Sequence, residues 1–200
     1  MRKPIASVAT IVVLAGCSAD GSNSVDVNST KDLVDLLQRT THFDYNVIDT
    51  PANLLDVADI AVVGEVVSVD SALQDKGSGP PVGAVIVGLR AVETWKDGPS
   101  INGNTVYYWF NRPTEVDISH YQNGLPLGTR IVLFAHEDTG VKLIESTAEF
   151  DTLYSAHPQG HIIESEDNHT VNVWASENEN LPEWEGLDTV AELRQATNRP

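Results

Sequence analysis

Residues 60–69, Ile-Ala-Val-Val-Gly-Glu-Val-Val-Ser-Val, are the stretch that decides the expected fold. Six of these ten residues are valine or isoleucine, whose β-branched side chains favour a pleated strand over a helix. Gly64 interrupts the run, as glycine does where a strand bends or bulges. The stretch therefore predicts a long strand with a bend in it.

Six further stretches of the chain predict strands. The stretch 84–95 again carries a glycine near its middle, Gly88, and 130–135 is apolar on both faces, so we expect it at the centre of the sheet. Between the first two strands, residues 74–83 are rich in glycine and proline and predict a loop. The predicted strands after the first are 84–95, 104–110, 130–135, 142–145, 160–165 and 171–174.

Short helices are expected on both sides of this strand region. Ser29 or Thr30 can cap a helix that begins at residue 31, and Pro51 favours the first turn of a helix over 51–57. A final amphipathic helix is expected around 187–193. The pattern predicts a mainly β fold, a small antiparallel OB-like barrel of five or six strands with short N-terminal helices and a C-terminal helix. A β-sandwich is the alternative.

The N-terminus has the pattern of a bacterial secretion signal. Two cations precede an apolar run that ends Leu-Ala-Gly-Cys17, and this ending resembles a lipobox, at which the cysteine is acylated and the bond before it is cut. The apolar run is shorter than the ~20 residues of a membrane-spanning helix. We therefore expect a signal peptide over 1–16, a lipidated cysteine with a flexible tether over 17–30, and one β-rich domain over 31–200, anchored on the extracytoplasmic face of the cell membrane. The composition resembles that of actinobacterial proteins.

The charge of the chain limits its partners. The net charge is −17, and removal of residues 1–16 takes away Arg2 and Lys3 and no acid, which leaves −19. Such a charge repels nucleic acid and anionic lipid surfaces. The expected partners are the membrane, reached through the lipid on Cys17, and a cationic peptide, a protein or a glycan. Cys17 is the single cysteine, so no disulfide within the domain is expected.

Three sequence motifs resemble motifs that recur in a known group of bacterial proteins. Residues 58–66 (Ala-Asp-Ile-Ala-Val-Val-Gly-Glu-Val), 95–98 (Trp-Lys-Asp-Gly) and 125–134 (Leu-Pro-Leu-Gly-Thr-Arg-Ile-Val-Leu-Phe) resemble a pattern of secreted and lipid-anchored bacterial proteins. That pattern is distantly similar to the OB-like barrel of netrin-type modules and metalloproteinase inhibitors. Those inhibitors bind the zinc of their target proteinase through a free N-terminal cysteine. In this chain the lipid would block Cys17, so the resemblance does not imply that the chain inhibits a metalloproteinase.

Aromatic side chains form the strongest candidate for a binding surface. Tyr107 and Trp109 alternate along one predicted strand with residues of the opposite face, and Trp95 and Tyr121 could add to the same surface. An aromatic face on an OB-type barrel can stack on a ligand. Burial in an ordinary core is the competing interpretation, and it is the one we expect for Trp109.

A metal site is the second candidate. His157 and His161 could ligate a metal together with acids from 164–167, although Pro158 and Gly160 predict a turn between them.

No nucleophile motif, phosphate-binding loop or cofactor motif occurs in the sequence. The leading hypothesis is therefore a binding or interaction module with no enzymatic activity and no cofactor. The alternative is a cell-envelope hydrolase that uses carboxylates from 137–151 and 164–167.

Overall fold

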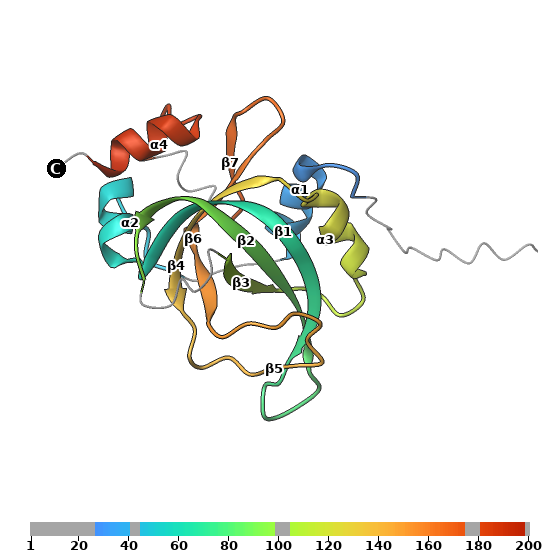
Figure 1. Ribbon diagram of the computed structural model, residues 1–200. Helices are drawn as coiled ribbons and strands as arrows, with labels where there is room; N and C mark the ends of the chain where they lie inside the picture. The colour runs from blue at the N-terminus through green and yellow to red at the C-terminus, as the bar shows by residue number, and fades with distance from the viewer. Residues whose placement is uncertain (1–26, 41–44, 99–104, 175–180, 199–200) are drawn as a thin grey trace, which may run out of the picture.

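The computed structural model describes residues 27–40, 45–98, 105–174 and 181–198, and its centre is a closed ring of five strands (Figure 1). β1 pairs antiparallel with both β2 and β4, β2 pairs with β3, and β4 pairs with β6. β3 and β6 run parallel and close the ring. The elements are α1 (Thr30–Thr40), α2 (Pro51–Val57), β1 (Ile60–Gln74), β2 (Val82–Lys96), β3 (Thr105–Asn111), α3 (Ile118–Gly124), β4 (Arg130–Glu137), β5 (Leu143–Ile144), β6 (Leu153–Glu164), β7 (Thr170–Asn172) and α4 (Val190–Thr197).

The predicted mainly β fold is confirmed, and the strands form one closed sheet instead of the two stacked sheets of a sandwich. The ring differs from a regular antiparallel barrel because the β3–β6 pair is parallel and β1 and β2 continue beyond the ring as a long hairpin. β1 bends as predicted. Its register against β2 shifts between Val63 and Gly64, and a Cβ atom at Gly64 would lie 2.8 Å from the Cβ of Leu89.

The four short helices of the described residues cover the ring in two pairs, α1 with α3 and α2 with α4 (Figure 1). α1 begins with a reciprocal cap, in which the Asp32 amide donates to Ser29 Oγ and the Asp32 carboxylate accepts from the Ser29 hydroxyl. Val27, which lies in the predicted tether, is 1% exposed and packs in the main core, so the packed part of the chain includes this residue. Cys17 and the predicted signal peptide lie outside the described residues. No helix of the described chain has the length and apolarity needed to cross a membrane.

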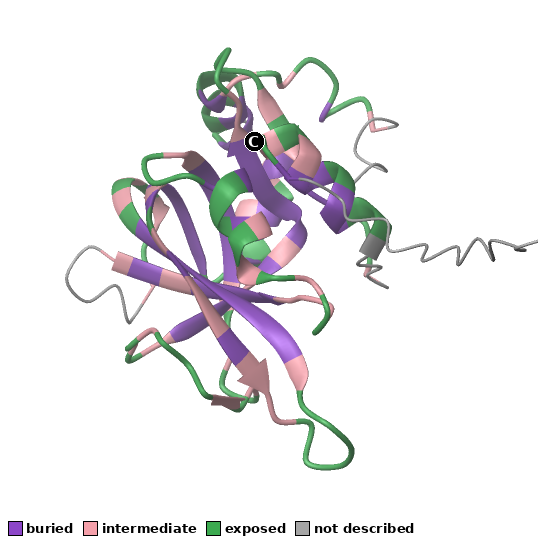
Figure 2. Cartoon of the chain, turned by 90° about the vertical axis from the view of Figure 1, so that its right-hand side faces the viewer, coloured by how far each residue is buried: buried purple, intermediate pink, exposed green. Residues whose placement is uncertain are grey.

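β4 separates two parts of the core, as its apolarity on both faces predicted. Ile131 and Leu133 face the interior of the ring, whereas Val132 and Phe134 face the cluster beneath α2 and α4. A third and smaller cluster lies on the outer face of β2 and β3. In Figure 2 the strands are largely purple, for buried residues, and the connecting loops are green.

The main correction to the predicted fold concerns residues 157–161, for which the sequence predicted a turn. These residues lie inside β6 and do not form a turn. Pro158 is accommodated because the register between β4 and β6 shifts at this point, and such irregularities are where strands accept proline. Gly160 is needed because a Cβ atom there would lie 2.5 Å from the Cβ of Phe134.

Candidate functional site

The four predicted ligand-binding aromatics do not form one surface. Tyr121, on α3, is completely buried in the main core, and burial raises the pKa of its hydroxyl to about 12. Trp95 packs edge-on against Phe134, with ring centroids 5.8 Å apart, in the cluster beneath α2 and α4. The expectation that Trp95 and Tyr121 add to the Tyr107 surface is therefore wrong.

Trp109 has a structural role on the outer face of β3. It is 9% exposed, and its indole N–H donates a 2.9 Å hydrogen bond to Asp138. Asp138 also accepts hydrogen bonds from the amides of Gly140 and Val141. Trp109 thus holds the start of the β4–β6 connection, residues 138–152, and the buried position that we expected for it is confirmed.

The β4–β6 connection folds back over this outer face and is fixed to the β1–β2 hairpin. Its short strand β5 pairs with the end of β1, and the Lys142 ammonium lies 2.7 Å from the Asp75 carboxylate. Thr147 donates from its backbone amide to Ser71. The two loops therefore lie at one end of the ring, the lower end in Figure 1.

Phe150 lies between two small pockets at this end, which together we call the Phe150 groove. The first has a volume of about 180 Å³ and the second about 300 Å³, and Phe150 and Asp151 line both. The Tyr107 and Phe150 rings lie 6.1 Å apart between centroids, with planes tilted by 42°. The groove is lined by Thr105, Tyr107, Asp138, Val141, Lys142, Leu143, Glu149, Phe150, Asp151, Thr152, Leu153 and Tyr154.

The position of the groove matches the place where OB-type barrels bind ligands. These barrels use the outer face of their second and third strands together with the loops between strands one and two and between strands four and five. In this ring the corresponding parts are the outer face of β2 and β3, the loop after Gln74, and the β4–β6 connection. Tyr107 is the one predicted aromatic that remains partly exposed there.

His161 is part of the core and does not face solvent. It is completely buried on β6, with Nε2 2.8 Å from the Tyr108 hydroxyl and its ring 4.6 Å from that of Trp174. Burial lowers the pKa of His161 to about 3. The imidazole is therefore neutral at physiological pH.

His157 has different neighbours. Its ring lies 5.6 Å from Tyr45 and 6.4 Å from His136, and burial together with the charge of His136 lowers its pKa to about 4. Within the described ranges, no group of three or more His, Cys, Asp or Glu side chains could hold a metal ion. The structure thus does not join His157 and His161 into the predicted metal site.

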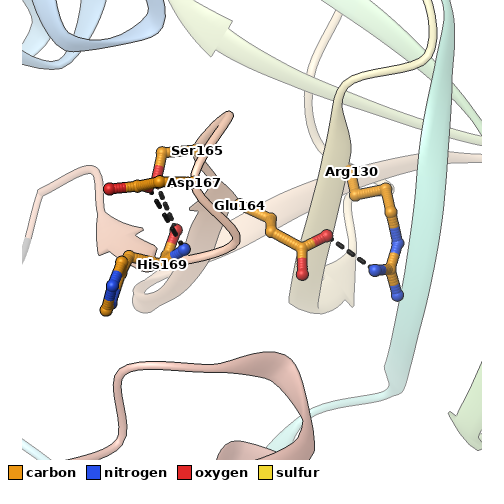
Figure 3. A network of polar contacts seen from close by, with 5 residues as sticks. All are labelled: Arg130, Glu164, Ser165, Asp167 and His169. Carbon is orange, nitrogen blue, oxygen red and sulfur yellow. Dashed lines mark hydrogen bonds and ion pairs between the residues drawn. The ribbon is translucent and has the colours of Figure 1, made fainter.

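Glu164 and Asp167, two of the acids of the 164–167 region, have polar partners at the end of β6 and in the β6–β7 connection (Figure 3). Arg130 lies 2.6 Å from Glu164, and the Ser165 hydroxyl lies 2.5 Å from Asp167 and 2.7 Å from the His169 carbonyl oxygen. The Ser165 hydrogen bond lowers the pKa of Asp167. A glycosidase-type acid needs a raised pKa, and the pKa of Asp167 is shifted in the opposite direction.

Sequence reasoning missed Phe150, and it included Glu149 and Asp151 only among the hydrolase carboxylates of 137–151, without placing them beside Tyr107. They lie in a stretch without periodicity, and only the return of the β4–β6 connection over β3 brings them to Tyr107. The comparisons with protein-family models, curated proteins and solved structures find no match to this chain.

Proposed function

We propose that this chain is a lipid-anchored, extracytoplasmic binding module without catalytic activity, and that the Phe150 groove is its ligand site. The groove is the observation that carries this proposal, because it combines a partly exposed aromatic pair with the position at which OB-type barrels bind ligands. Anchoring rests on the lipobox-like residues that end at Cys17.

The carboxylates support binding over hydrolysis. Hydrogen bonds lower the pKa of each described carboxyl group whose pKa clearly departs from its ordinary value. Such lowered values are typical of surface carboxylates that cap helices and turns. The groups concerned are Asp32, Asp75, Asp117 and Asp167.

Anchoring is tested by metabolic labelling with an alkyne fatty acid, followed by membrane fractionation. The wild-type chain should carry the label and sediment with membranes, whereas Cys17→Ala should lose the label. Equal distribution of the two chains, with residues 1–16 retained in both, would refute the anchor.

Ligand binding is tested with soluble material released from bacterial envelopes, separated into peptide and glycan fractions. At least one fraction should perturb the NMR signals of Tyr107 and Phe150 in the full chain held in detergent. The matched control is Val57, an exposed apolar residue on α2. If no fraction perturbs the groove more than Val57, the proposed binding function fails.

A further inference from the structure

Two carboxylates of the Phe150 groove have neither an ion pair nor a hydrogen bond among the described residues. Asp138 already accepts three hydrogen bonds, and Lys142, the cation in the lining, is paired with Asp75. Glu149 and Asp151 are both exposed, and neither forms an ion pair or a hydrogen bond with any described residue.

Carboxylates on the strand surfaces differ from these two. Glu65 pairs with Arg90, Glu93 with Arg194 and Glu164 with Arg130. The chain has 12 Lys and Arg residues against 29 Asp and Glu residues, so most acids must remain unpaired. Glu149 and Asp151 are nevertheless distinctive because they line a pocket together with aromatic residues, among them the partly exposed Tyr107 and Phe150.

The aromatic pair adds a second attraction for a cation. A guanidinium or ammonium group over an aromatic face is attracted by the negative charge of the ring face. Tyr107 and Phe150 are both partly buried, and their rings are tilted rather than stacked face to face. A planar guanidinium could pack on one ring while it donates hydrogen bonds to Glu149 or Asp151.

Other ligand classes fit the groove less well. An anionic ligand would meet two unpaired carboxylates on a chain of net charge −17. A neutral glycan could pack on the rings, but it would desolvate Glu149 and Asp151 without supplying a positive charge. A volume of about 180 Å³ suits one long side chain, and the pocket of about 300 Å³ beyond Phe150 leaves room for its neighbours in a peptide.

We propose that the Phe150 groove binds an arginine or lysine side chain of a cationic peptide segment, with the cation between Glu149 and Asp151 and its stem against Tyr107 and Phe150. This inference rests on the proposed function, because it names the ligand class of the same site. The occupant is a peptide cation, and a glycan is the alternative that the experiment distinguishes.

The test measures the fluorescence anisotropy of the peptide Gly-Ser-Arg-Ser-Gly, labelled with an uncharged dye, as the full chain in a non-ionic detergent is added. The paired probe replaces arginine with citrulline, which keeps the shape and removes the charge. The arginine peptide should bind about tenfold more tightly, which is the difference that one exposed charge-assisted contact of about 1.4 kcal/mol produces. Added salt should weaken binding of the arginine peptide alone.

The variant Glu149→Gln/Asp151→Asn should lose about tenfold in affinity for the arginine peptide. Its matched control is Asp56→Asn/Glu166→Gln, which removes the same charge at exposed positions that do not line the groove. The control should bind within about twofold of wild type. Both variants change exposed side chains, so equal melting temperatures show that each chain remains folded.

Equal binding of the arginine and citrulline peptides would overturn the inference, as would equal losses in the two double variants. No binding of the arginine peptide at millimolar concentration would overturn it as well. If a chito-oligosaccharide perturbs Tyr107 and Phe150 while the peptide does not bind, the cation assignment fails and the groove remains a binding site. If the envelope fractions also leave the NMR signals of Tyr107 and Phe150 unchanged, both the cation assignment and the proposed binding function fail.

Discussion

Acid should destabilise this fold through His161. Burial lowers the pKa of His161 from 6.5 to about 3, so in the interval between these values the unfolded chain binds a proton that the folded chain does not. The stability that this residue contributes is present above pH 6.5 and is lost as the pH falls toward 3. One pKa unit corresponds to about 1.4 kcal/mol, so a change from pH 7 to pH 5 should cost about 2 kcal/mol through His161 alone.

The assay is urea unfolding at pH 7, 6 and 5, with wild type compared with His161→Phe. The variant leaves the Tyr108 hydroxyl without its partner, so it should be less stable than wild type at pH 7, but its stability should depend less on pH. His157 also has a lowered pKa, but it is present in both chains, so its effect of the same sign cancels in the comparison. Carboxylates such as Asp75 have lowered pKa values and titrate below this window.

The expected result is that wild type loses about 2 kcal/mol more than His161→Phe between pH 7 and pH 5. If both chains lose the same stability, His161 is protonated within the fold at pH 5, and the reasoning from its burial is refuted.

Three further stability changes follow from the core and can be measured by chemical denaturation. Trp109→Ala should cost about 3–5 kcal/mol, as for a buried large aromatic, and a loss below 1 kcal/mol would show an exposed indole. A chain that starts at Asn28, which keeps the Ser29 cap, should be about 1.5–3 kcal/mol less stable than one that starts before Val27, because it loses a buried valine, and equal stability would show that Val27 contributes nothing to the core. Gly160→Ala should destabilise the fold by about 1–3 kcal/mol through overlap with Phe134, and an unchanged unfolding midpoint would contradict the close approach.

Most strands could be predicted because their side chains carry the signal locally. Residues 60–69 and 130–135 are rich in β-branched and apolar residues, and both form strands close to the predicted bounds. The first half of β6 could not be predicted in this way. Pro158 and Gly160 are turn residues by local preference, and only the register shift against β4 and the close approach to Phe134 make them suitable in a strand.

The helix α3 was missed although a local signal was present. Asp117 caps it by accepting a hydrogen bond from the Ser119 amide, but the helix has only seven residues and no long apolar repeat. Its position in the fold explains why Tyr121 is in the core and not on a binding surface.

The candidate site could be predicted only in part. Tyr107 was identified because it alternates with core residues along β3, and the structure places it at the groove. Glu149, Phe150 and Asp151 could not be joined to it, since their contacts depend on how a connection of about fifteen residues returns across the sheet. Sequence patterns report the periodicity of an element, and they do not report where a nonperiodic segment packs.

The most direct test of the account is photo-crosslinking in living cells, with benzoylphenylalanine in place of Phe150. The matched position is Val57, which is exposed on α2 and outside the groove. Position 150 should give an adduct in the membrane fraction that excess arginine peptide suppresses and that the Glu149→Gln/Asp151→Asn background weakens. Position 57 should give no such adduct. An absence of adduct at position 150, or equal adducts at both positions whether or not the peptide is present, would contradict the account.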